Sequence, residues 1–168
     1  NGKLSARYAL SEDLALRGSY STGFRAPTPG QSNTNSTNQG LDTKTLLLFT
    51  SGRLANNDPL AILLGAQALK PEKSKNLSLG FTWKTPAGFS GSVDVYDIKV
   101  SDRFSTSAAF AVPAGVANPF RYTSVSYFTN DFDTTTRGID IVGSHLSRIG
   151  DGKLNLTLAY NYNTTKVD

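Results

Sequence analysis

The chain has 168 residues, and its 17 Lys and Arg against 13 Asp and Glu give a formal net charge of +4 at pH 7. The basic residues are scattered, and the tightest group, Lys70, Lys73 and Lys75, is interrupted by Glu72, which argues against nucleic-acid binding. With no Cys and one His, His145, the sequence has almost no material for a zinc site or a Ser-His-Asp triad.

Amino-acid composition favours an all-β fold. The chain has 9 Phe and 7 Tyr beside many Thr, Val and Ser residues, and 15 Gly and 7 Pro interrupt them as recurring turn signals. Its longest apolar run, residues 60–69, is about half of the roughly 20 residues that a membrane-spanning helix needs. The chain contains no Met and begins at Asn1, so we expect it to be a piece of a longer protein.

Alternation of apolar and polar residues predicts six antiparallel strands, at about residues 2–10, 14–22, 75–84, 89–103, 122 or 135–146, and 153–164. The last strand has the clearest pattern, because Leu154, Leu156 and Leu158 alternate with Asn155 and Thr157. Period two places these two sets on opposite sides of a sheet, and we expect the Leu set to meet lipid. The fourth and fifth strands have the weakest pattern, as expected where a hairpin continues into water beyond a membrane.

The connections between these strands alternate in length. Ser11 to Asp13, Thr85 to Gly88 and Ser147 to Gly152 are short turns, whereas residues 23–74 and about 104–122 form long connections. Because each strand reverses direction, the short turns fall at one end and the long loops at the other. Transmembrane β-barrels place short turns on the periplasmic side and long loops outside. The alternative is a soluble β-sandwich binding module of a secreted protein, whose strands also alternate.

Within the first long connection, Asp58 followed by Pro59 predicts the start of a short helix that runs to Leu69. The segment from Gln31 to Gly40 is rich in Asn, Thr and Ser and is expected to have no fixed structure. Gly150-Asp151-Gly152 is expected to be a tight turn. Further along the chain, the sequence leaves open whether Asn130, Asp131 and Asp133 are Ca²⁺ ligands or Asx residues of a turn.

Candidate binding residues combine aromatic surface with positive charge at the outer ends of the strands, and they are Phe24, Arg25, Phe104, Phe120, Arg121 and Tyr122. Charged residues in the strands should face the lumen, because charge is costly on the lipid side, and the candidates are Arg17, Lys84, Asp94 and Asp140. His145 is expected to be an interfacial side chain near a periplasmic turn. No catalytic group, resident metal or cofactor is predicted.

Several short sequence words occur in order along the chain, and they are Ser21–Thr28, Leu69–Ser74, Val93–Val100, Asp102-Arg103, Tyr127–Asn130 and Arg137–Asp140. Each word is common alone. Together, with this order and spacing, they resemble the barrel region of TonB-dependent outer-membrane receptors over most of the chain.

The resemblance implies a segment of a 22-stranded barrel in the bacterial outer membrane, closed by an N-terminal plug domain. The complete protein would bind a siderophore, cobalamin, haem, glycan or peptide and import it with energy from TonB, without catalysis. Its partners would be the rest of the barrel and the plug, the TonB complex through that plug, the nutrient and outer-membrane lipid. By the same resemblance, the four charged strand residues would face the plug.

Overall fold

The computed structural model describes residues 1–168, which form nine strands and two short helices. The chain divides into two compact units. The hairpin unit comprises residues 1–24, 73–101 and 133–168, and the loop unit comprises residues 25–72 and 102–132. No helix is both long enough and apolar enough to cross a membrane.

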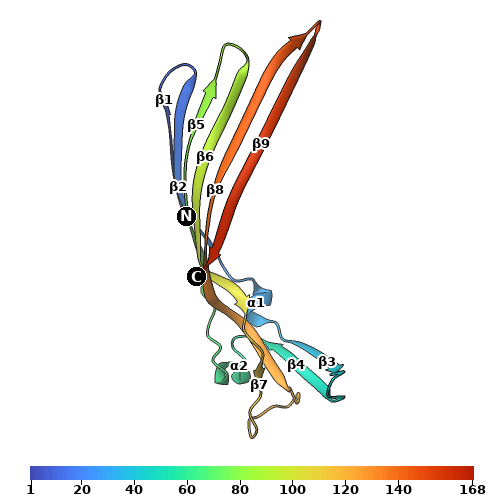
Figure 1. Ribbon diagram of the computed structural model, residues 1–168. Coiled ribbons are helices and arrows are strands. Elements are labelled where there is room, and N and C mark those ends of the chain that lie inside the picture. The colour runs from blue at the N-terminus through green and yellow to red at the C-terminus, as the bar shows by residue number, and fades with distance from the viewer. The chain divides into compact units, whose positions relative to one another are not determined.

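Three antiparallel hairpins make up the hairpin unit (Figure 1). They pair β1 with β2, β5 with β6, and β8 with β9, and the sheet order is β1-β2-β5-β6-β8 with β9 on the other side of β8. All six predicted strands are confirmed, with the bounds Gly2–Ala9, Leu14–Arg25, Glu72–Lys84, Phe89–Thr106, Ser124–Ile149 and Gly152–Val167. The sheet is open at both edges, which agrees with a segment of a larger barrel.

Short turns join the two strands of each hairpin and lie at one end of the hairpin unit (Figure 1). The Ser11 hydroxyl accepts the backbone N–H of Leu14 at 3.1 Å, and the Thr85 N–H donates to the Phe89 carbonyl at 2.7 Å. The third turn is tighter than the predicted Ser147 to Gly152. Gly150 takes a φ of +58°, a conformation that glycine adopts without steric cost, so β8 continues to Ile149 before it reverses.

The register of the hairpins sorts side chains onto two different faces. On the polar face, the Ser19 and Ser78 hydroxyls lie 2.8 Å apart, and the Ser144 and Thr157 hydroxyls lie 3.0 Å apart. The apolar face carries the alternate residues, which include Leu4, Tyr8, Leu16, Leu77, Leu79, Phe81, Trp83, Leu156, Leu158 and Tyr160. These side chains extend outward with little cover, as the exposures of Leu4 (75%) and Leu158 (78%) show. A sheet of this kind needs an apolar medium on one side only.

The first long connection is folded, contrary to the prediction that Gln31 to Gly40 has no fixed structure. It contains α1 (Pro29–Asn33), β3 (Ser36–Leu41), β4 (Leu48–Leu54) and α2 (Pro59–Leu63). Thr28 and Gln31 form a capping box at the start of α1, and β3 pairs with β4 in antiparallel register. The polar composition suggested disorder, but β4 satisfies the backbone of this segment from further along the chain.

Helix α2 begins as predicted, because the Asp58 carboxylate accepts the Leu60 N–H at 2.9 Å and Pro59 occupies the first turn. It ends at Leu63 rather than at the predicted Leu69, since Gly65 follows with a φ of +101° that reverses the chain.

A further difference is that β4 runs parallel to β8, with Leu54 opposite Tyr127, so the sheet is not entirely antiparallel. The second connection adds the short strand β7 (Phe110–Ala111), which is antiparallel to β8.

A small hydrophobic core holds the loop unit together. Its buried members are Leu54, Leu60, Ala61, Ala66, Tyr122, Val125 and Tyr127. They come from β4, α2 and its following turn, and β8 and the residues just before it. The Tyr122 ring covers Gly52, where an added Cβ would lie 2.8 Å from the Tyr122 Cε1. This core fixes the two long connections to the extension of β8.

Replacing Gly52 by Ala should destabilise the loop unit by about 1–3 kcal/mol, because the buried Tyr122 ring has little room to move. Limited proteolysis of the full-length protein measures the effect as faster cleavage within residues 25–72. Gly30→Ala is the matched control, since its added methyl group meets nothing nearer than 3.8 Å. Equal cleavage rates in the two variants would contradict this packing.

Candidate functional site

An arginine, a carboxylate and an aromatic ring come together in the loop unit. The Arg25 Nε lies 2.8 Å from Glu72 Oε2, and the Arg25 Nη2 donates to Glu72 Oε1 at 2.9 Å, which makes the pair bidentate. The Arg25 guanidinium also lies over the Phe104 ring, 5.3 Å from its centroid. The Arg25 side chain remains 63% exposed, whereas that of Glu72 is 10% exposed. The exposed Arg25 guanidinium therefore presents a positive charge, and the largely buried Glu72 carboxylate fixes its orientation.

The charge on Glu72 is held by its surroundings. Burial raises the pKa of its carboxyl group, but the backbone N–H of Phe104, at 2.9 Å, and the charges of Arg25 and Arg103 outweigh this effect. The net result is a pKa below the ordinary value, so the carboxylate stays ionised at neutral pH and keeps its hold on Arg25.

The other predicted binding residues have different surroundings from Arg25. Phe24 and Arg25 are adjacent in β2, so their side chains point to opposite sides of the strand. Phe120 is 67% exposed, and its ring centroid lies 5.6 Å from that of Tyr122. Tyr122 itself is 7% exposed and its hydroxyl lies 3.0 Å from that of Thr37, so it acts as a core residue. Arg121 has a φ of +51° and follows Phe120 in the chain.

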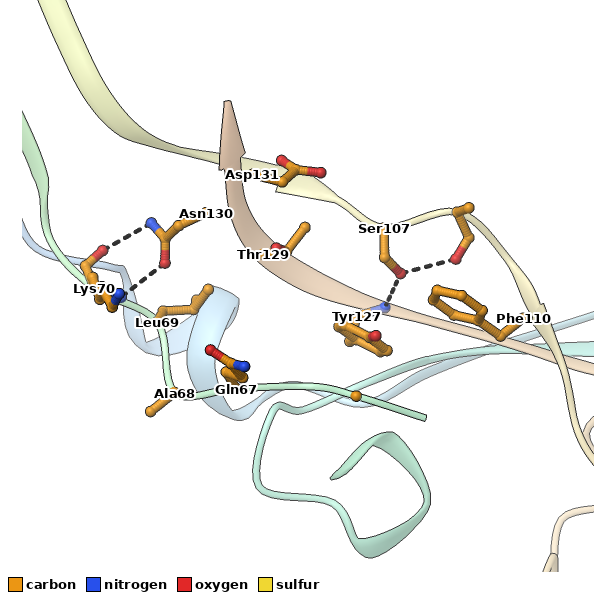
Figure 2. Close-up of a pocket in the computed structure, with 12 residues that line it drawn as sticks. Gln67, Ala68, Leu69, Lys70, Ser107, Phe110, Tyr127, Thr129, Asn130 and Asp131 are labelled. Carbon is orange, nitrogen blue, oxygen red and sulfur yellow. Dashed lines mark hydrogen bonds between the residues drawn. The ribbon is translucent and has the colours of Figure 1, made fainter. Parts of the chain in front are cut away.

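A second concave site lies elsewhere in the loop unit, between the segment after α2 and strand β8 (Figure 2). Its volume is about 390 Å³. The Phe110 and Tyr127 rings stack with a centroid distance of 5.7 Å, and the Tyr127 hydroxyl donates to the Leu64 carbonyl at 2.8 Å. Polar groups of Gln67, Thr129 and Asp131 complete the lining. Two rings surrounded by hydrogen-bonding groups can hold a small polar organic molecule.

Asn130 fixes one wall of this pocket, as Figure 2 shows. Its side-chain oxygen accepts the Lys70 N–H at 2.8 Å, and its amide nitrogen donates to the Lys70 carbonyl at 3.0 Å and to the Asp102 carbonyl at 2.6 Å. The Asn130 side chain thus makes the two hydrogen bonds to the Lys70 backbone that a neighbouring strand would otherwise make. The segment before β5 is held in place without any regular secondary structure.

The interpretation of Asn130, Asp131 and Asp133 as Asx residues of a turn is wrong, because all three belong to the long strand β8. The Asn130 oxygen is already bonded to Lys70, and Asp131 Oδ1 accepts the Ser105 hydroxyl at 2.5 Å. No group of three His, Asp or Glu side chains is arranged to hold a metal ion.

The predicted lumen-facing charges all lie in the hairpin unit, and three of the four have polar partners across strands. The Arg17 Nε donates to Asp94 Oδ1 at 2.7 Å, although 77 residues separate them in the chain. Asp140 accepts a hydrogen bond from Asn161, its register partner on β9. Lys84 has a weaker contact, 3.8 Å from Asp13 at the end of the hairpin unit that carries the turns. Arg17 and Asp94 therefore neutralise each other within the sheet, and the Asp140 carboxylate is satisfied by a neutral amide.

Sequence reasoning missed the pocket around Tyr127. Gln67 was not singled out in the sequence, and Asn130 was considered only as a cation ligand or a turn residue, because its contact with Lys70 spans 60 residues. Tyr127 did belong to a sequence word that resembled the receptor family, but the word gave no indication that Phe110 would stack on it.

Comparison with known proteins identifies the architecture. The model of the TonB-dependent receptor-like β-barrel family matches residues 1–168. Among solved structures, a double mutant of the ferric enterobactin receptor PfeA from Pseudomonas aeruginosa has a TM-score of 0.61 at 18% identity, covering 95% of this chain and 21% of that chain. The siderophore receptor PirA from Acinetobacter baumannii has a TM-score of 0.48 at 13% identity, covering 98% of this chain and 33% of that one. The search of curated proteins found no match.

Replacing Glu72 by Gln should destabilise the loop unit by roughly 1–3 kcal/mol at neutral pH, because Arg25 loses a charged acceptor. The wild-type pKa is lowered from its ordinary 4.5, so the stabilisation is complete above that value and is lost as pH falls through the lower folded pKa. Pulse proteolysis of the full-length protein across this range measures the difference. A difference that does not shrink as pH falls through the folded pKa would contradict an ionised Glu72 as its source.

Proposed function

Because this chain belongs to the TonB-dependent receptor β-barrel family, we propose that it forms part of the wall of an outer-membrane receptor that binds a scarce nutrient and imports it with energy transmitted by TonB. The chain spans about one fifth of the ferric enterobactin receptor and one third of the siderophore receptor to which it was compared. The remaining strands, the plug domain and the TonB contacts of the whole protein are part of the proposal.

The observation that carries this proposal is the two-faced sheet of the hairpin unit. Residues such as Leu79 and Leu158 on the apolar face have no second protein layer above them. A soluble β-sandwich would bury this face against another sheet, whereas a barrel wall leaves it to lipid. The opposite face, with its Arg17 to Asp94 ion pair, would line the lumen and meet the plug. Charges placed there avoid the cost of the hydrocarbon region.

The direction of the strands follows from their connections. The short turns at residues 10–13, 85–88 and 150–151 would lie on the periplasmic side, and the connections that build the loop unit would lie outside the cell. Loops held on a rigid scaffold commonly carry binding residues. The Arg25 cluster and the pocket at Tyr127 are therefore the proposed contacts of the nutrient, together with the exposed Phe120 and Arg121.

The proposed action is binding and passage of the nutrient. The polar groups of the two sites are amides, hydroxyls, the Asp131 carboxylate and the Arg25 to Glu72 ion pair, all of which can contact a ligand through hydrogen bonds or charge. A ferric siderophore, cobalamin, haem, a glycan and a peptide all present surfaces that an arginine, an aromatic pair and hydrogen-bonding groups can contact. Selection among them depends on the rest of the outer loops.

The assignment of faces predicts opposite effects at neighbouring positions of β9. Leu156→Arg should destabilise the assembled barrel by about 2–4 kcal/mol if the residue lies near the bilayer midplane, because the charge would enter hydrocarbon. Asn155→Arg is the matched control and should be mild, since this residue belongs to the polar face. Urea unfolding of the full-length receptor in lipid vesicles measures both. The reverse order of effects would place lipid on the other face.

The pocket at Tyr127 predicts a loss of affinity without a loss of folding. Replacing Gln67 and Asp131 together by Ala should weaken nutrient binding about tenfold, since each lost hydrogen bond contributes roughly 0.5–1.5 kcal/mol. Growth on a panel of iron, cobalamin, haem, glycan and peptide sources identifies the nutrient, and titration then gives its affinity. Gln39→Ala with Asp151→Ala removes the same two groups outside the pocket. Unchanged affinity in the first variant would remove this pocket from the binding site.

A further inference from the structure

The apolar face contains a notch of about 350 Å³ at Gly143. Its apolar lining comes from Trp83, Phe89, Leu156 and Leu158, and His145 borders it. A Cβ added to Gly143 would have no atom within 4 Å, so nothing in the chain fills this space. Gly91 on the same face differs, because the Trp83 ring already occupies the place of its missing side chain. The notch is therefore a gap between the aromatic and leucine side chains that line it.

Aromatic rings around the notch indicate its position along the strands. Trp83 and Phe89 flank the short turn at residues 85–88, and the Phe81 and Trp83 ring centroids lie 5.5 Å apart. The Phe89 and His145 rings stack with centroids 4.0 Å apart, which agrees with the expected interfacial position of His145. Barrels in membranes carry such aromatic girdles at the level of the lipid headgroups and ester groups. The notch would thus open at the periplasmic interface of the bilayer.

His145 borders the notch on this face at that level, beside the indole N–H of Trp83. Its Nδ1 is buried and accepts or donates no hydrogen bond. With Nδ1 enclosed by protein atoms, Nε2 is the ring nitrogen that can meet a group from outside the chain, and it donates a hydrogen bond when it carries the ring proton. That donor would then be available to an oxygen from outside the chain.

We propose that this notch binds a phospholipid of the periplasmic leaflet, with one acyl chain over Gly143 and an ester or phosphate oxygen accepting a hydrogen bond from His145. The proposal rests on the proposed function, in which the apolar face meets lipid. The rim belongs to β5, β6, β8 and β9, which are neighbours in one sheet. Further barrel strands would join at the edges β1 and β9, and a plug would lie on the opposite face, so neither covers the notch.

The lining favours a lipid over a protein partner. An acyl chain needs only a narrow apolar channel, which Leu156, Leu158 and Trp83 provide. A protein partner would have to insert a side chain into the notch and also pack against the exposed Leu79 and Tyr160 around it. The ring N–H groups of His145 and Trp83 near the interface match the layer of ester and phosphate oxygens that a phospholipid offers at that depth.

Native mass spectrometry of the full-length receptor, titrated with phosphatidylethanolamine in mild detergent, tests this site. The wild type should retain one lipid at low lipid-to-protein ratio. Gly143→Leu fills the notch and should lower that occupancy about tenfold, whereas Ala6→Leu adds bulk elsewhere on the apolar face and should leave it unchanged. His145→Phe keeps the stack on Phe89 but removes the donor, and it should give an intermediate loss.

The outcomes separate this proposal from the proposed function. Heat-modified electrophoretic mobility first confirms that each variant forms a barrel, and if Gly143→Leu does not, the His145→Phe titration decides the case. Equal lipid retention in the wild type and the assembled notch variants would overturn the lipid site, as would a receptor dimer that only the notch variants lose. Nutrient uptake should be the same in all four proteins. A failure of the proposed function would appear instead in the Leu156 and Asn155 comparison.

Discussion

The register of the three hairpins is the constraint on which the rest of this structure depends. Because side chains alternate along a strand, a slip of one residue between β8 and β9 would move Leu156 and Leu158 to the side that now carries Asn155 and Thr157. The two sides demand opposite media, so the membrane itself penalises such a slip at every strand. The short turns reinforce the register from one end, where Gly150 and the Ser11 hydroxyl leave the hairpins little freedom in length.

The polar face illustrates how a barrel wall carries charge without exposing it to lipid. Arg17 and Asp94 come from different hairpins, and so do Tyr96 and Asn161, whose side chains lie 3.3 Å apart. Gly80 lies opposite Asp94 in the register and has no side chain to obstruct it, since an added Cβ would collide with the carboxylate. These cross-strand contacts bind the hairpins to one another in addition to the backbone ladder.

The loop unit uses a different device, in which asparagine side chains satisfy backbone groups of distant segments. Asn56 donates to the carbonyls of Gln67 and Phe128, Asn118 holds both backbone groups of Tyr122, and Asn130 does the same for Lys70. An asparagine amide offers both a donor and an acceptor, as a peptide group does. The long connections can therefore be fixed to β8 without regular strands, which leaves their outer side chains available to a ligand.

The sequence by itself determined the six long strands, the apolar and polar faces of the most regular ones, the alternation of short and long connections, and the start of α2 at Asp58 and Pro59. These features depend on neighbours within a few residues, where period two, turn residues and helix caps act. It also located the charges of the polar face, because the cost of charge in hydrocarbon allows only one side. Only the tertiary structure decided that Gln31 to Gly40 folds onto β4, that β4 runs parallel to β8, and that Tyr122 is buried. The candidate site divided in the same way. The aromatic and basic residues Phe104 and Arg25 could be recognised in the sequence. The Glu72 carboxylate that orients Arg25 acts across 47 residues, and the Asn130 amide that shapes the pocket acts across 60 residues. Contacts at that separation leave no periodic trace in the sequence, so their partners are fixed only when the strands are assembled.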